Sequence, residues 1–382
     1  MGMPFAFLFT LLLASSFLIT MVSSQTATTT TSKHQVAYLM AEDSPGGRLS
    51  VVSQSGVYSV IYDYHDYNSP TVYPDDVVAD SAGHLIVAEC GMDMLTRITL
   101  PSTRTVIHSF PTGSCPASVV IDPAGNYIVA LATAHELVKV TPAGVMTVIH
   151  AFSPSGTDCG PVGWGNPFRI AIDSSGNYIV TECASDRLSM VTPAGAYSVI
   201  YNFTKGTTPT GVAIESSGNY IVGECGTLTI SKVTPSGERT VVYAYPSGTP
   251  SCGAPSFIGD LSVAIDPSGN YIVAEYLTFT LAVITPGGVR TPIFTIPIAV
   301  WGNKSMGQYS YQHPTSVQVV NASLFQTTTS STSSSMATSS STTASSSTAT
   351  AGSANYAVYL VAGAGVAVVA VAAAVMLRRR HH

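Results

Sequence analysis

Short apolar runs that alternate with polar turns cover most of this chain. In the clearest stretch the runs are five or six residues long, rich in Val, Ile and Tyr, and bounded by turns that contain Gly or Pro. They predict four strands, at Phe168–Ile172, Tyr178–Glu182, Arg187–Val191 and Tyr197–Tyr201. Nothing in this stretch has a helical period, so the pattern indicates antiparallel strands linked as hairpins.

The four-strand unit recurs along the chain. The sequence Gly-Asn-Tyr-Ile-Val begins at Gly125, Gly176, Gly218 and Gly269, and a variant, Gly-His-Leu-Ile-Val, begins at Gly83. The spacings are 42, 51, 42 and 51 residues, and a second turn motif, Thr-Pro-x-Gly, follows each of the last four copies. A period of about 45 residues with two turn signals is typical of β-propeller blades.

We name the strands of each unit a to d, from the central channel outwards. Six c strands are predicted, and they indicate an all-β, six-bladed propeller: Arg48–Val52, Arg97–Leu100, Leu137–Val140, Arg187–Val191, Ile230–Val233 and Leu281–Ile284. The first unit lacks an a strand, because Tyr38–Glu42 already matches a b strand. The missing strand is predicted at His313–Val320, so the C-terminal strand should complete blade 1 and close the ring, which removes exposed sheet edges.

The segments that flank the repeats predict a cell-surface protein. An apolar run that ends in small residues predicts a signal peptide over residues 1–24, followed by a Thr-rich segment over 25–33. The propeller is predicted over residues 34–322, with a Ser/Thr-rich stalk over 323–355, a single transmembrane helix over 356–377 and a cytoplasmic tail over 378–382. This is the order of a single-pass type I membrane protein with an extracellular propeller.

The membrane anchor has an alternative. Three arginines, Arg378 to Arg380, follow the apolar run as a stop signal, which favours a membrane span. Small residues at 351–353 are also typical of a site where the apolar tail is exchanged for a GPI lipid anchor. N-glycosylation sequons are predicted at Asn202, Asn303 and Asn321.

The charge of the chain excludes one class of partner. Charged residues are 9% of the chain, and without the three tail arginines 12 basic residues face 21 acidic ones, a net charge of −9. Nucleic-acid binding needs a clustered basic surface. The expected partners are therefore an extracellular protein or a glycan, with the membrane engaged through the C-terminal helix.

All six cysteines lie in the repeats. Three follow the ends of b strands, and three lie in crossings from strand d of one blade to strand a of the next. In a four-stranded meander the b–c loops and the d–a crossings emerge on the same face, which predicts three disulfides: Cys90–Cys115, Cys159–Cys183 and Cys225–Cys252. A metal cluster is the alternative, and the wide cysteine spacing disfavours it.

The motifs resemble a known class of propeller. The unit Asp173-Ser-Ser-Gly-Asn-Tyr-Ile-Val-Thr-Glu182, followed by Arg187-Leu and Thr192-Pro-Ala-Gly195, resembles the NHL-repeat class and the streptogramin-lyase-like propellers over about residues 34–320. The resemblance implies a six-bladed propeller and says little about function. The chain departs from the NHL pattern, because Glu replaces the usual Asp at the end of strand b and Leu131 stands there in blade 3.

A glutamate ends the b strand in five of the six units, at Glu42, Glu89, Glu182, Glu224 and Glu275. A residue that is present in nearly every blade is expected to serve a structural role there, such as accepting backbone N–H bonds in the b–c turn. An acidic ring that binds cations is the alternative.

Candidate ligand-binding residues near the channel lie at the starts of the a strands: Asp76, Arg169, Asp260 and His313. The resemblance to gluconolactonase-like propellers implies a divalent cation held by channel carboxylate and amide groups. Here Asp75, Asp76 and Asp260 are the available acids and Arg169 opposes them, so we expect no cofactor, with Ca²⁺ or Mg²⁺ as the alternative. The catalytic His and Glu of lyase-like enzymes cannot be placed on this sequence, so no catalytic residue is predicted.

The longest d–a crossings carry a second set of candidates. Both tryptophans and two tyrosines lie there, and we predict a binding role for Trp164, Trp301, Tyr309 and Tyr311. The alternative is that each Trp fills the gap between neighbouring blades.

Two functions are consistent with these patterns. The favoured one is a cell-surface recognition or adhesion module, and the alternative is a membrane-tethered propeller hydrolase or lyase that uses a divalent cation. Three oxygen ligands converging at one depth in the channel would favour the enzyme. A mixed ring with Arg169 inside it would favour binding.

Overall fold

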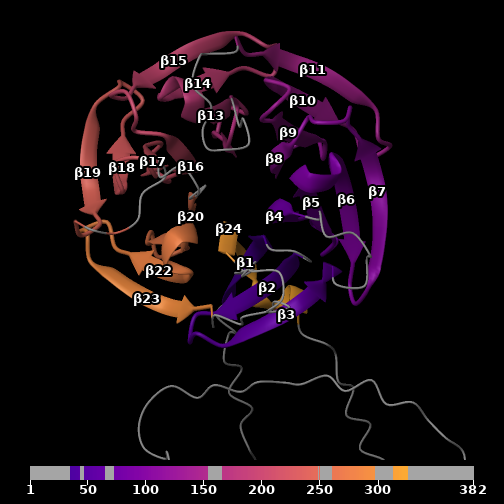
Figure 1. The fold of residues 1–382 in the computed structure, drawn as a ribbon, viewed down its shortest axis with the longest axis horizontal. Coiled ribbons are helices and arrows are strands. Elements are labelled where there is room, and N and C mark those ends of the chain that lie inside the picture. The colour runs from indigo at the N-terminus through magenta and orange to yellow at the C-terminus, as the bar shows by residue number, and fades with distance from the viewer. Residues whose placement is uncertain are drawn as a thin grey trace, which may run out of the picture. The chain divides into compact units, whose positions relative to one another are not determined.

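The structure, a computed structural model, describes residues 35–43, 47–64, 73–153, 166–247, 249, 260–296 and 313–325. These residues form six four-stranded antiparallel sheets arranged as the blades of a propeller (Figure 1). The predicted all-β, six-bladed architecture is confirmed. Its short 3₁₀ turns are η2 (Cys90–Met92), η3 (Cys183–Ser185), η4 (Tyr276–Thr278) and η5 (Ala322–Phe325).

Within each blade the strands follow one another from the channel outwards. Blade 1 consists, from its innermost strand to its outermost, of β24 (His313–Asn321), β1 (Val36–Asp43), β2 (Arg48–Ser53) and β3 (Tyr58–Asp63). Blade 2 consists of β4 (Pro74–Ala79), β5 (Leu85–Glu89), β6 (Met94–Thr99) and β7 (Thr103–Ser109). Blade 3 consists of β8 (Pro116–Ile121), β9 (Tyr127–Leu131), β10 (Glu136–Val140) and β11 (Met146–Ala151).

The second half repeats this order. Blade 4 consists of β12 (Ile170–Ile172), β13 (Tyr178–Glu182), β14 (Arg187–Val191) and β15 (Tyr197–Asn202). Blade 5 consists of β16 (Pro209–Ile214), β17 (Tyr220–Glu224), β18 (Thr229–Val233) and β19 (Arg239–Ala244). Blade 6 consists of β20 (Leu261–Ile265), β21 (Tyr271–Glu275), β22 (Thr280–Ile284) and β23 (Arg290–Thr295).

The C-terminal strand closes the ring, as the sequence predicted. Strand β24 pairs antiparallel with β1, and Val36 lies opposite Asn321. Just beyond this pair the N–H of Ala322 donates to the carbonyl of Gln35 at 2.7 Å. Blade 1 is therefore built from both ends of the described chain.

The repeated Asp-x-x-Gly-Asn sequence makes the turn between strands a and b. In blade 4, one carboxylate oxygen of Asp173 accepts the N–H groups of Ser175 and Asn177, both at 2.8 Å, and its other oxygen accepts the Asn177 amide at 2.9 Å. Gly176 takes a φ of +83°, which other residues rarely adopt. This chemistry explains why the motif recurs in the units.

Apolar side chains fill the space between blades. The b strands are buried along their whole length, as in β13 and β17, which explains their almost continuous apolar sequence. One cluster joins blades 4 and 5 through Ile179, Leu188 and Val222. The propeller core therefore consists of the inter-blade layers.

Each outermost strand carries an irregularity that alters its pairing. In blade 4, Leu188 pairs with Tyr201 and Ser189 pairs with Val199, so Ile200 is skipped. The c–d pairs of the other five blades have the same register shift. Such bulges increase local twist and make an exposed edge less able to pair with another chain.

The predicted signal peptide and membrane span lie outside the described residues and remain predictions. The predicted stalk, residues 323–355, is described only at 323–325, which belong to the short turn η5, and the rest of it also remains a prediction. Within the described ranges, no helix is long and apolar enough to cross a membrane.

Candidate functional site: the central channel

One position on each inner strand, or directly before it in blade 4, defines a ring around the channel. The ring is occupied by Asp76, Ser118, Arg169, Gly211, Ser262 and Ser316. Several of these side chains accept an N–H from the next blade. The Asp76 carboxylate accepts the N–H of Val119 at 3.0 Å. In the same way, Ser118 Oγ accepts the N–H of Ile170 at 3.3 Å, and Ser262 Oγ accepts the N–H of Val317 at 3.4 Å. The polar ring therefore joins neighbouring inner strands.

Blade 5 has a glycine at the ring position for a steric reason. A Cβ on Gly211 would lie 2.0 Å from the carbonyl oxygen of Leu261 in blade 6, so no side chain fits there. The neighbouring Thr210 accepts the N–H of Leu261 at 3.1 Å in its place. Blade 5 keeps the link to blade 6 by moving the acceptor one residue along the strand.

Arg169 is the exception in the ring, because it extends across the channel. Its Nη2 donates to Asp260 Oδ2 at 2.5 Å and to the Thr315 carbonyl at 2.7 Å. Its Nη1 donates to the Ala117 carbonyl and lies 3.8 Å from Asp76 Oδ2. One guanidinium from blade 4 thus contacts blades 1, 2, 3 and 6.

The charge of Arg169 is held in a buried environment, with 6% of its side chain exposed. Burial alone would lower the pKa of Arg169, but the nearby carboxylates of Asp260, Asp76 and Asp75 raise it above its usual value. Burial also raises the pKa of Asp260, and the guanidinium opposes that rise. Arg169 is therefore a permanent cation inside the channel.

The three acids do not form a fitting site for a divalent cation. Ca²⁺ takes about six to eight oxygen ligands, and a guanidinium beside them opposes binding. Here Asp260 binds Arg169 directly, and Asp76 accepts Ser118 Oγ at 2.8 Å as well as the N–H of Val119. The negative charges are balanced by a cation that the chain itself supplies.

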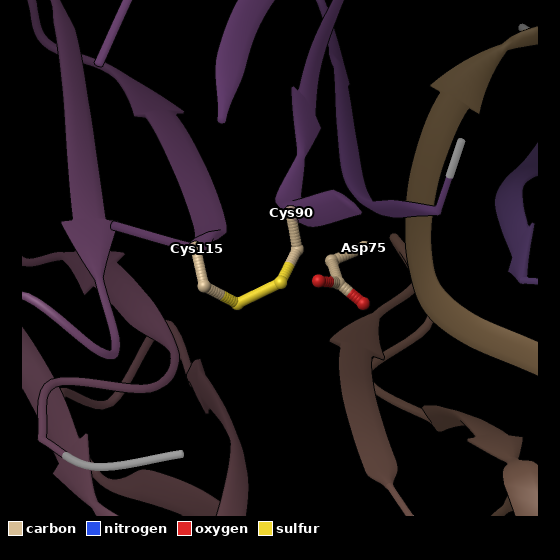
Figure 2. A group of neighbouring side chains, drawn as sticks. All are labelled: Asp75, Cys90 and Cys115. Carbon is tan, nitrogen blue, oxygen red and sulfur yellow. A yellow bond between two sulfur atoms is a disulfide. The ribbon is translucent and has the colours of Figure 1, made fainter. Parts of the chain in front are cut away.

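Asp75 lies at the edge of this cluster, beside a disulfide. Figure 2 shows its carboxylate next to the Cys90–Cys115 bridge, and its oxygen lies within 4.8 Å of both sulfur atoms. Thiolates bind metals, and these two sulfurs are bonded to each other. The trio is therefore a disulfide with an acidic neighbour and not a metal centre.

The Cys90–Cys115 disulfide confirms the first of the three predicted pairs. Cys183 and Cys225 are also disulfide-bonded. Their predicted partners, Cys159 and Cys252, lie outside the described residues, so those two pairings remain predictions.

The structure brings Asp76, Arg169 and Asp260 together and places His313 elsewhere. The His313 ring stacks on Tyr276 with centroids 3.9 Å apart and on Phe279 at 4.4 Å, and its Nδ1 lies 3.0 Å from the Tyr276 carbonyl. Burial lowers the pKa of His313, which favours the neutral ring. His313 thus packs on the b–c loop of blade 6.

The aromatic candidates Trp164, Trp301, Tyr309 and Tyr311 lie outside the described residues, as does the Asn303 sequon. Their binding roles and its glycosylation remain predictions. Asn202 and Asn321 are both exposed at the ends of their strands.

The repeated glutamates are structural, and the donors that bind them are side chains, whereas the sequence suggested backbone N–H groups of the b–c turn. Glu89 is fully buried. Its carboxylate accepts hydrogen bonds from Thr96 Oγ1 at 2.6 Å, from the Tyr64 hydroxyl at 3.0 Å, and from the Nε and Nη2 of Arg104. The five glutamates all accept side-chain donors in this way: Glu42, Glu89, Glu182, Glu224 and Glu275. Each is buried within a blade, so they form no cation-binding ring.

The partners of these glutamates carry a sequence signal that comparison of the turn motifs missed. An arginine lies 15 residues after the glutamate in three blades, at Arg104, Arg239 and Arg290. In blades 1 and 4 a tyrosine of strand d binds the glutamate instead: Tyr58, 16 residues after Glu42, and Tyr197, 15 residues after Glu182. Strand c lies between these two strands, so the side chain from strand d reaches across strand c to the glutamate.

No family model matches the chain, and no curated protein matches it. Among solved structures, it resembles a virginiamycin B lyase from Staphylococcus aureus, with 15% identity over 69% of this chain and 85% of that chain and a TM-score of 0.51. It also resembles a protein of unknown function from Bacteroides caccae, with 13% identity over 75% of this chain and 99% of that chain and a TM-score of 0.53. At such identities the likeness concerns the fold, and it confirms the resemblance to streptogramin-lyase-like propellers at that level.

Proposed function

We propose that this protein is a cell-surface recognition module whose propeller binds an extracellular glycan or protein. The observation that carries the proposal is Arg169, which occupies the channel and neutralises the acids that a catalytic cation would use. A propeller scaffold of this kind is suited to presenting loops for recognition. The predicted signal peptide, stalk and membrane span support a position at the cell surface.

A screen of the purified full-length protein on an array of extracellular glycans tests this proposal. Saturable binding to a related group of glycans is the expected result. Retention on the array in a heat-unfolded control would identify non-specific adsorption. If neither a glycan nor a cell-surface protein binds, the result contradicts the proposed recognition role.

The recognition module and the competing enzyme differ in whether a divalent metal ion should stabilise the fold. Because Arg169 already balances Asp76 and Asp260, millimolar Ca²⁺ or Mg²⁺ should leave the melting temperature nearly unchanged. A ligand at a hundred times its dissociation constant would stabilise the fold by about 2.7 kcal/mol, which thermal unfolding easily detects. A rise of several degrees that Asp260→Ala abolishes would favour the membrane-tethered hydrolase or lyase.

A further inference from the structure

Three arginines of the blades bind glutamates through complete two-pronged forks. Arg239 donates through Nε and Nη2 to the two carboxylate oxygens of Glu224, at 2.7 and 2.5 Å. Arg290 does the same with Glu275 at 2.7 and 2.6 Å, and Arg104 binds Glu89 through the same two nitrogens. In each pair both oxygens of the acid are used, which is the strong geometry for an arginine and a carboxylate.

Arg169 makes half of such a fork with Asp260. Its Nη2 donates to Asp260 Oδ2 at 2.5 Å and also to the Thr315 carbonyl at 2.7 Å. Burial raises the pKa of Asp260, and Arg169 and the nearby Thr210 hydroxyl oppose that rise. Even so, Arg169 Nε and Asp260 Oδ1 are buried with no hydrogen-bond partner in the described part of the chain. The second prong of the fork is therefore not formed directly.

A third buried polar atom belongs to the strand that closes the ring. Ser316 of β24 follows Thr315, whose carbonyl binds Arg169, and 1% of Ser316 is exposed. Among the described residues the Ser316 hydroxyl also has no hydrogen-bond partner. Buried hydroxyls in proteins are nearly always hydrogen-bonded, so this one requires an explanation.

The order of bonds around the ring explains why Ser316 lacks a protein partner. Ser262 accepts the N–H of Val317, which is the residue after the ring position of the next blade. The matching N–H for Ser316 is that of Val77, and this group already donates to the carboxylate of its neighbour Asp76 at 2.9 Å. The Ser316 hydroxyl is thus available for another partner.

The three atoms define the chemistry of a molecule that could bind them. Arg169 Nε can only donate, Asp260 Oδ1 accepts, and the Ser316 hydroxyl can do either. The guanidinium repels a cation, and the carboxylate repels an anion. A small neutral molecule that accepts one hydrogen bond and donates two satisfies all three atoms, and water is the smallest such molecule.

We infer that the channel binds a water molecule that bridges Arg169 Nε, Asp260 Oδ1 and Ser316 Oγ. This water completes the fork between blades 4 and 6 and ties it to β24, so it is a structural ligand at the point where the ring closes. A bridge through water is nearly as favourable in enthalpy as a direct hydrogen bond. The site is independent of the proposed recognition role.

A crystal structure of the full-length protein, from crystals grown without alcohols and at a resolution that shows ordered water, tests the site. One peak should lie about 2.7–3.2 Å from Arg169 Nε and at a similar distance from Asp260 Oδ1 or Ser316 Oγ. A direct bond from Nε to Oδ1, the absence of a peak or density for a larger molecule would overturn the inference. So would a peak about 2.0–2.6 Å from Asp260, the range of a bound metal ion.

The urea midpoint of Ser316→Ala gives a second test, in which the sign of the shift decides. If water binds the hydroxyl, the variant loses a hydrogen bond, and the midpoint should fall with an unchanged slope. If the hydroxyl is buried without a partner, its removal should raise the midpoint or leave it unchanged, which would contradict the bridge. Ser262→Ala is the matched control, because it leaves the Val317 N–H without its acceptor and should lower the midpoint with or without water.

Discussion

Blades 2 and 3 are neighbours with the same strand order, but the side chains buried at three corresponding positions are polar and charged in blade 2 and apolar in blade 3. Blade 2 buries Glu89 with Thr96 and Arg104, and blade 3 places Leu131, Val138 and Met146 at the corresponding positions. All three members change together, from a hydrogen-bonded charge network to an apolar cluster.

The preceding blade contributes to the same difference. The side chain that follows strand d of blade 1 is Tyr64, and its hydroxyl donates to Glu89 at 3.0 Å. The corresponding residue before blade 3 is Phe110, which joins the apolar cluster of Leu131. The fold accepts either solution because a buried charge needs its complete set of partners and an apolar cluster needs none.

The largest effect is expected from removing the charge in blade 2. Glu89→Leu would leave Arg104, whose side chain is 9% exposed, together with the Tyr64 and Thr96 hydroxyls, without their acceptor. Breaking a buried pair in this way costs about 3–5 kcal/mol. The shift of the urea midpoint measures it, with Leu131→Met as a control that should cost less than about 1.5 kcal/mol.

The reverse change in blade 3 should also destabilise the fold. Leu131→Glu buries a carboxyl among apolar side chains with no donor from Val138 or Met146, at a cost of about 3 kcal/mol. Adding Val138→Thr and Met146→Arg supplies the equivalents of Thr96 and Arg104, though not of Tyr64, and should recover more than half of the loss. If the triple variant is no more stable than Leu131→Glu alone, the three residues do not act as one unit.

A smaller effect on folding stability is expected from substituting the glutamates, and its sign should depend on whether an arginine of strand d binds the carboxylate. Glu42 is fully buried, and its described donors are Ser50 and Tyr58. Burial raises the pKa of Glu42, and these hydrogen bonds and the charge of Arg48 oppose the rise. The folded protein therefore holds this proton more strongly than the unfolded chain does.

The sign of the pH dependence follows from this raised pKa. The contribution of Glu42 to stability is greatest below the unfolded pKa and falls as the pH rises through the folded pKa. Glu42→Gln should remove this fall and gain about 1.4 kcal/mol at neutral pH for each pKa unit of the shift. Melting temperatures between pH 4.5 and 8 measure it.

The matched change in blade 6 should act in the opposite direction. Glu275→Gln weakens the fork with Arg290, whose nitrogens lie 2.7 and 2.6 Å from the carboxylate, and should lower stability at neutral pH. Equal pH profiles for the two variants would show that the arginine makes no difference.

The sequence by itself determined the blade count, the closing strand and the Cys90–Cys115 bridge. These features follow from signals that lie within one repeat unit or from the comparison of one unit with the next. The Asp173 turn is an example, because its donors at Ser175 and Asn177 lie two and four residues away. A period in the sequence is sufficient to place such elements.

Only the tertiary structure decided what the channel contains and how the buried acids are balanced. The partners of Arg169 at Ala117, Asp260 and Thr315 lie 52, 91 and 146 residues away in the sequence, and no local pattern links them. Repeat alignment placed Arg169 on the ring but could not show that its long side chain crosses it. The physical reason is that ring closure brings inner strands of all blades within reach of one guanidinium, and this proximity exists only after the whole propeller has formed.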